Sequence, residues 1–170
     1  MTYTIINFNL DSAGGPSPLF CFQQRNRNIE GLRDRIEREL LPFVDRPARY
    51  MGGEYGAGRW NGAGDSLRVA LLYPDLYEVG MSNLGLKVLR QVAAAVTGVE
   101  VDRAFVPWAD AEARMRERGI PLYGLDSSLP LAAFDLVGVT LQSELTVTNV
   151  LTALDLAGIP LRSEDRGEDH

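Results

Sequence analysis

Residues 67–80 read LRVALLYPDLYEVG, and the first seven of them form a nearly continuous apolar run. Runs of this kind are typical of strands that are buried on both faces of a parallel sheet. Pro74 ends the run, because proline cannot donate to the hydrogen-bond ladder of a central strand. A second such run, FDLVGVTL at residues 134–141, predicts another buried strand.

Helical and extended segments alternate around these two strands. A helix is predicted over residues 83–96 and is closed by Gly98; its apolar side contains Leu84, Val88, Leu89, Val92, Ala93 and Val96. The β-favouring residues of segment 99–106 predict a strand. A short helix is then expected from Asp110, acting as its cap, to Arg118, with Gly119 as its stop.

The chain after this helix repeats the alternation. Residues 121–125 are expected to be a short strand or an extended segment, and a helix follows the 134–141 strand from about Val147. Gly158 and Pro160 end that helix, and Leu161 starts toward a further strand before the sequence turns polar.

This order of strands and helices predicts an α/β fold with a doubly wound, flavodoxin-like or Rossmann-like parallel sheet and right-handed crossovers. A five-stranded sheet of the flavodoxin type requires two more strands than we find. We therefore expect an incomplete, truncated sheet with a raw edge where the next strand would pair.

Three segments are predicted along the chain. Residues 1–28 contain Gly and Pro without periodicity and are expected to be a loose arm. Residues 29–65 contain a helix over 29–44, followed by a Gly-rich loop whose Arg, Tyr and Trp side chains pack on the body of the protein or hold a ligand. Residues 66–170 form the α/β domain.

Composition excludes several classes of protein. The net charge of -6 and the pI of about 4.8 argue against nonspecific binding of nucleic acid. No stretch approaches the roughly 20 apolar residues of a membrane span, so a cytoplasmic location is expected. Cys21 is the only cysteine and His170 the only histidine, too few for a zinc site, an iron–sulfur cluster or Cys-His catalysis. The sequence therefore predicts no metal site and no catalytic residue in this chain.

Two loops are the candidate sites for a ligand. In open α/β sheets, ligands bind at the carboxyl ends of strands near the point where the strand order reverses. The loop after residue 73 contains Asp75, Tyr77, Gly80 and Ser82, and the second buried strand ends at Thr140 and Leu141 before a loop with Ser143.

Each of these residues also has a purely structural interpretation. Asp75 is of a type that often caps a loop, and Tyr77 is of a type that packs at the end of a sheet. Gly80 permits a helix to approach closely. Ser143 and Thr146 are typical caps of a helix.

The first loop carries a more specific pattern. Asp75-Leu76-Tyr77-Glu78-Val79-Gly80 resembles the Asp-x-His-x-x-Gly frame of cobalamin-binding domains, and residues 137–143 resemble the loop of those domains that lines the nucleotide tail of cobalamin. Four longer strings, in order along the chain, are similar to a group of bacterial cobalamin (vitamin B12)-binding-like radical SAM proteins: residues 46–55, 73–86, 116–122 and 149–161.

The resemblance implies cofactor-binding roles for Asp75, Tyr77, Gly80, Ser82, Thr140 and Ser143. It also implies a downstream partial barrel with a Cys-x-x-x-Cys-x-x-Cys motif, which holds a [4Fe-4S] cluster and cleaves S-adenosylmethionine. That domain is absent from this sequence, so radical chemistry by this chain alone is not expected.

The position of Tyr77 divides the functional hypotheses. The resemblance places a histidine there as the lower ligand of cobalt, whereas a phenol with a pKa near 10 is a poor ligand at neutral pH. One hypothesis is a domain that presents cobalamin, or a corrinoid-shaped surface, to the downstream barrel. The other is a cofactor-free α/β interaction module that docks the catalytic domain or a macromolecular substrate.

An unrelated receiver or flavin-binding domain is disfavoured. Lys87, the only lysine, lies within a predicted helix rather than after a late strand, where a receiver domain requires it. The acidic residues of segment 75–78 do not suit the phosphate of a flavin.

Overall fold

The computed structural model describes residues 2–7, 31–54, 60 and 66–165. Its centre is a four-stranded sheet in the order β1-β4-β2-β3. The strands are β1 (Thr2–Asn7), β2 (Leu67–Tyr73), β3 (Val99–Phe105) and β4 (Leu136–Leu141). β2 pairs in parallel with both β3 and β4, while β1 runs antiparallel along the outer edge of β4.

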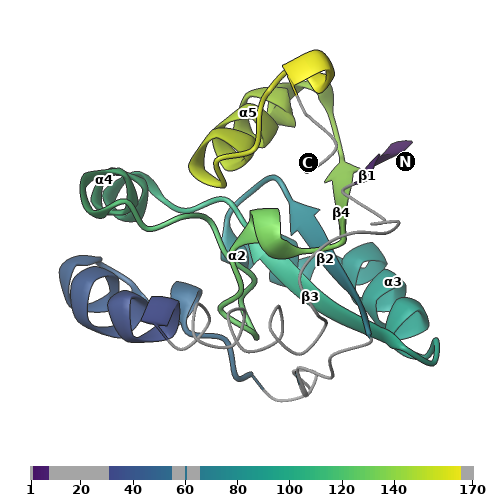
Figure 1. Cartoon of the computed structure of the whole chain (residues 1–170), viewed down its shortest axis with the longest axis horizontal. Coiled ribbons are helices and arrows are strands. Elements are labelled where there is room, and N and C mark those ends of the chain that lie inside the picture. Colours follow the sequence, from purple (N-terminus) through teal and green to yellow (C-terminus); the bar gives the residue numbers. More distant parts are fainter. Residues whose placement is uncertain (1, 8–30, 55–59, 61–65, 166–170) are drawn as a thin grey trace, which may run out of the picture.

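Helices cover both faces of the sheet. α3 (Leu84–Ala94) lies on one face, and α4 (Ala109–Arg118) and α5 (Val147–Leu156) lie on the other, as Figure 1 shows to the right and left of the strands. The short helix α2 (Tyr77–Ser82) follows β2. The predicted α/β fold with an incomplete doubly wound parallel sheet is therefore confirmed.

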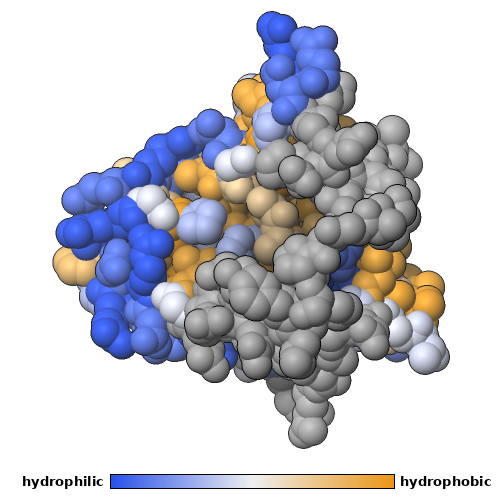
Figure 2. Space-filling model, viewed as in Figure 1, coloured by the Kyte–Doolittle hydropathy of each residue, from blue (hydrophilic) through white to orange (hydrophobic). Residues whose placement is uncertain are grey.

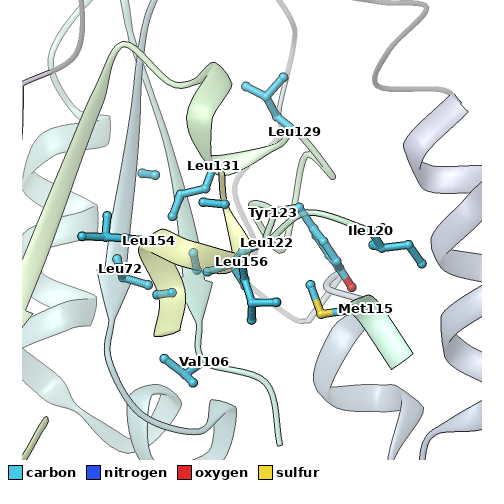
Figure 3. Packing of buried hydrophobic residues seen from close by; sticks show 14 of the residues in the cluster. Leu72, Val106, Met115, Ile120, Leu122, Tyr123, Leu129, Leu131, Leu154 and Leu156 are labelled. Atoms are coloured by element: carbon cyan, nitrogen blue, oxygen red, sulfur yellow. The ribbon is translucent and has the colours of Figure 1, made fainter. Parts of the chain in front are cut away.

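Alternation along β2 explains why its sequence is apolar throughout. Val69, Leu71 and Tyr73 face the α3 side, whereas Ala70 and Leu72 face the side of α4 and α5. The larger of the two cores lies on the α4 and α5 side. There Leu72 packs with residues from segment 120–131 and from α5 (Figure 3).

The segment before the Gly-rich loop is helical but irregular. Residues 31–35 are α-helical, and the chain then continues as the π-helix η1 (Ile36–Leu40) and the 3-10 helix η2 (Leu41–Phe43). Leu32, Ile36 and Leu40 are buried in the core on the α4 side, as their spacing predicts. Ile29, the first residue of the predicted helix, lies outside the described residues.

The Gly-rich loop packs on the body of the protein where it is described. It begins with the 3-10 helix η3 (Pro47–Tyr50), and the Trp60 ring meets the Phe134 ring edge-on at 5.8 Å. The Tyr123 hydroxyl donates to the carbonyl of Tyr50. Packing was one of the two alternatives for this loop, and these contacts favour it.

The loose-arm prediction is wrong for Thr2–Asn7. These residues form β1, with Thr2 opposite Leu141 and Asn7 opposite Leu136. The backbone groups on the outer edge of β4 would otherwise lack a partner in the sheet, and β1 satisfies them. The predicted raw edge of β4 is therefore covered, while residues 8–28 of the predicted arm lie outside the described part of the chain.

The predicted face of α3 is also wrong in part. Leu86, Leu89 and Ala93 pack on the sheet. The residues that recur every fourth position point to solvent instead, with exposed fractions of 72% for Leu84, 51% for Val88, 62% for Val92 and 55% for Val96. Apolar residues line a wider part of α3 than the sheet covers, with Lys87, Arg90 and Gln91 on the remaining side, so spacing alone does not decide which apolar residues are buried.

Smaller corrections concern ends of elements. Trp108 is the N-cap of α4, and Asp110 lies inside the first turn, where its carboxylate accepts from the backbone N–H groups of Asp45 and Ala111. Gly119 ends α4 as predicted, in the left-handed conformation with φ 59°. A further strand was predicted to begin near Leu161. The described chain after α5 forms the 3-10 helix η6 (Ser163–Asp165) instead.

Candidate functional site

The reversal of strand order lies between β2 and β4. The chain moves from β2 to β3 through α3 and then returns across the sheet to β4, so the loops after β2 and β4 leave the same end of neighbouring parallel strands. The side chain of Asn149 in α5 donates to the carbonyl of Pro74 at 3.0 Å and joins the two loops. This is where the general rule for open α/β sheets places a ligand.

Asp75 serves the local backbone. Its carboxylate accepts from the backbone N–H of Leu76 at 2.7 Å, and its carbonyl accepts from the backbone N–H of Val106 at 3.1 Å. The loop predicted over residues 74–83 is in fact partly helical, since it contains α2. These bonds match the capping interpretation of Asp75, and they fix the entry into α2 against the end of β3.

Tyr77 points into the protein. Its ring meets Phe105 edge-on at 5.6 Å, and its hydroxyl donates to Glu54 at 2.7 Å. Burial, followed by the hydrogen bond to the negatively charged Glu54, raises the pKa of Tyr77 to about 12. The phenol therefore stays protonated at neutral pH, and its one proton is used inside the fold.

Gly80 allows α2 to lie directly on the sheet. A Cβ atom at this position would stand 2.6 Å from Cδ1 of Phe105 and 3.1 Å from Cδ1 of Tyr73. The close-approach interpretation of Gly80 is therefore supported by geometry. Ser82 is exposed, and its hydroxyl donates to the carbonyl of Val79 one turn earlier.

The hydroxyl residues near the second loop have separate surroundings. Thr140 is 3% exposed and lies within β4, opposite Tyr3 of β1. Ser143 precedes the 3-10 helix η5 (Glu144–Thr146) and caps it by accepting from the backbone N–H of Leu145. The Thr146 hydroxyl donates back to the carbonyl of Ser143. The capping interpretation thus describes Ser143 and Thr146.

A buried ionic network lies behind Tyr77, and sequence reasoning missed it. The Arg103 guanidinium donates to Glu54 and to Asp126, at 3.0 Å in each case, and contacts the sulfur of Met81. Burial raises the pKa of Glu54, but hydrogen bonds from Tyr77 and Arg103 outweigh that effect and lower the pKa overall. The network holds together the Gly-rich segment, α2 and the edge strand β3.

One signal in the sequence points to this network. Asp102 and Arg103 are adjacent charges inside a segment predicted to be a strand. In the structure Asp102 is fully buried, and its carboxylate accepts from the backbone N–H groups of Arg103, Asp126 and Ser127 and from the Ser127 hydroxyl. Buried charged groups require hydrogen-bond partners. Adjacent charges inside the predicted strand therefore indicate that β3 anchors a neighbouring loop, which here contains Asp126 and Ser127.

A small aromatic pocket opens at the carboxyl end of β3. Tyr50, Tyr77, Trp108 and Tyr123 line it, with Arg49 at 5.9 Å from the Trp108 ring centre. Its free interior volume of about 20 Å³ corresponds to roughly one water molecule. The three tyrosine hydroxyls have partners within the protein: Tyr50 accepts from the backbone N–H of Trp108, Tyr77 donates to Glu54, and Tyr123 donates to the carbonyl of Tyr50. The pocket is too small for an organic cofactor.

The sequence resemblance places the lower ligand of cobalt at position 77, so cobalamin would bind here without a lower ligand from the protein. Tyr77 does not fit that role, because its hydroxyl is bound to Glu54, its ring is packed on Phe105, and its pKa lies far above neutral pH. In the described residues no group of three or more His, Cys, Asp or Glu side chains is arranged to hold a metal ion. The cofactor-binding roles of the six sequence-predicted residues stay predictions.

None of the helices in the described ranges has the length and apolarity needed to cross a membrane. No curated protein and no solved structure matches the chain significantly. The family described as radical SAM proteins, N-terminal, matches residues 85–170, just over half of the chain. The match includes β3, α4, β4, α5 and α3 from its second residue, and hence two of the four described strands and the helices that cover the sheet. This chain therefore belongs to the family of N-terminal regions of radical SAM proteins.

Proposed function

We propose that this region is a cofactor-free α/β module that docks the catalytic domain of a radical SAM protein. The observation that carries the proposal is the exposed row of Leu84, Val88 and Val92 along the outer side of α3, continued by Val96 in the turn that follows the helix. We call these four residues the α3 stripe. The family itself implies a companion catalytic domain, which provides the partner.

The α3 stripe has the spacing of a helix that binds through one side. Residues four positions apart on a helix lie above one another, so the three stripe residues within α3 form a single row about 12 Å long at 1.5 Å per residue. Single exposed apolar residues are common, whereas a continuous row on one element marks an interaction surface. Hydrophobic atoms are visible at the right-hand edge of Figure 2, where Figure 1 places α3.

The polar groups at the switch point support the same function. Asp75, Tyr77 and Ser143 bind partners within the protein. A cofactor site needs polar groups directed at the ligand, and these three are directed at the fold instead.

The test is a calorimetric titration of this region with the separately produced catalytic domain. The double variant Val88→Gln and Val92→Gln removes the middle of the α3 stripe with a residue that favours helices. Leu151→Gln is the matched control, because Leu151 is also apolar, helical and exposed but lies on α5 across the sheet.

We expect saturable association of the unchanged region, weakening of about tenfold or more in the double variant, which corresponds to ~1.4 kcal/mol, and no change for Leu151→Gln. Equal affinity of all three proteins would refute the α3 stripe as the docking surface. Absence of association at any concentration would refute the docking function.

Presentation of cobalamin is the second candidate. It is favoured by the Asp75-x-Tyr77-x-x-Gly80 frame and by the position of both loops at the switch point. Titration with hydroxocobalamin, followed by visible absorbance, distinguishes the candidates. Saturable binding with a spectral change would favour the cofactor function, and an unchanged spectrum would favour the docking module.

A further inference from the structure

The strand that pairs with the outer edge of β4 runs antiparallel to the rest of the sheet. β2, β3 and β4 are parallel, and β1 alone is antiparallel. β1 also comes from the opposite end of the sequence, so its pairing with β4 joins residues more than 125 positions apart. β4 itself is apolar and carries buried residues on both of its faces, which is typical of an interior strand rather than of a protected edge.

The crossover rule assigns this edge to a different strand. The chain moves one way from β2 to β3 with α3 on the first face, and the opposite way from β3 to β4 with α4 on the second face. Right-handed crossovers produce this switch of face when the direction reverses. α5 covers the same face as α4, so a parallel strand after α5 continues in the same direction. Its place is the outer side of β4, which β1 occupies.

β1 lacks the features that protect an edge strand. Its sequence, TYTIIN, contains no charged residue and no proline. Natural edges usually carry lysine, proline or a bulge to prevent pairing with another strand. Within the described sheet β1 pairs with β4 alone, so its release breaks one ladder and leaves the parallel ladders of β2 intact.

We infer that the outer edge of β4 is an acceptor for a parallel strand, and that β1 is a removable cover of this edge. The strand that replaces β1 is an extended, largely apolar segment that follows α5 in the full-length radical SAM protein. This inference rests on the topology and on family membership, and it does not depend on the α3 stripe.

Residue-resolved hydrogen exchange on two proteins tests the inference: the 170-residue chain and the full-length protein that includes the catalytic domain. In the 170-residue chain we expect the amides of β1, and the β4 amides bonded to them, to exchange about 100-fold or more faster than those of β2, because they open without global unfolding. In the full-length protein the same β4 amides become as protected as those of β2, and the β1 amides lose protection.

Deletion of residues 1–7 provides an independent readout in the same two proteins. The 170-residue chain should melt at a lower temperature without β1, and the full-length protein should melt at an unchanged temperature. Protection of β1 that persists in the full-length protein, or an equal loss of melting temperature in both proteins, would overturn the inference. Exchange of β1 in step with β2 in the 170-residue chain would also overturn it.

Discussion

At the scale of single residues, the sequence motif singles out position 77, but it does not predict the contacts that the Tyr77 side chain makes. The frame from Asp75 to Gly80 and the poor match of a tyrosine to cobalt are both visible in the sequence. Glu54, which accepts from Tyr77, and Arg103, which donates to Glu54, are 23 and 26 positions away along the chain, and only the fold brings them together. A local sequence pattern cannot predict a contact between residues so far apart in the chain.

The Tyr77 hydroxyl stabilises the fold in a pH-dependent way. Its pKa is raised from about 10 in the unfolded chain to about 12 in the fold. The stabilisation is therefore complete below pH 10 and is lost as the pH rises from 10 toward 12. Tyr77→Phe should lower the free energy of unfolding by about 1 kcal/mol at pH 7, because Glu54 keeps Arg103 but loses one donor.

Urea unfolding of both proteins at pH 7 and pH 11 measures this effect. The difference between unchanged protein and Tyr77→Phe should shrink at the higher pH, because the Tyr77 phenol ionises in the unfolded chain above pH 10 while it stays protonated in the fold. Tyr50 and Tyr123, whose pKa values burial also raises, are common to both proteins and cancel. A difference that is the same at both pH values would contradict the assigned role of the hydroxyl.

Gly80 is a second position of this kind. A glycine there indicates a close approach of the helix, but the sequence does not show which side chains it approaches. Gly80→Ala places a methyl group against the rings of Phe105 and Tyr73, and we expect a loss of about 1–3 kcal/mol in the free energy of unfolding. Gly31→Ala is the matched control: a Cβ there meets no atom of the described residues within 4 Å, so the helix should gain up to about 1 kcal/mol. Thermal unfolding compares the two, and equal melting temperatures would refute the close approach of α2.

At the scale of elements, the sequence predicts that a helix or strand exists, and which of the two it is, better than it predicts which side of the element is buried. The helix at residues 83–96 and the strand at residues 99–106 are both present with nearly the predicted bounds. The side of α3 that faces the sheet was not predictable, because apolar residues occupy a wider part of its circumference than the sheet covers. β1 was missed for another reason: a single run of five β-favouring residues, Thr2 to Ile6, has no visible partner until β4 is placed beside it.

Truncation on the two sides of α3 tests its orientation directly. Leu86 is 2% exposed and packs on the sheet, so Leu86→Ala should cost about 2–5 kcal/mol of unfolding free energy. Val88→Ala, on the α3 stripe, should change stability by no more than about 0.5 kcal/mol. Chemical denaturation of the two variants is the measurement, and the reverse order of effects would mean that the stripe is the buried side.

At the scale of the whole molecule, the alternation of elements was sufficient for the fold class. Two continuous apolar runs identified the strands at the centre of the sheet, and the helices between them required crossovers on both faces. The network of Arg103, Glu54 and Asp126 was not predictable in this way, since it depends on the tertiary position of three separate segments. The exposure of the α3 stripe, the proposed docking surface, was not predictable either, because an exposed apolar row and a buried one have the same spacing.

We propose that the catalytic domain covers the α3 stripe in the assembled radical SAM protein. The most direct measurement is the rate at which a thiol reagent labels Val92→Cys, read by mass spectrometry of the peptide that contains it. Leu151→Cys on α5 is the control. We expect labelling of Val92→Cys to slow by about 100-fold or more when the catalytic domain is joined to this region, as burial in an interface core excludes water. The control should be labelled equally in both proteins, and an equal rate for Val92→Cys with and without the catalytic domain would contradict the claim.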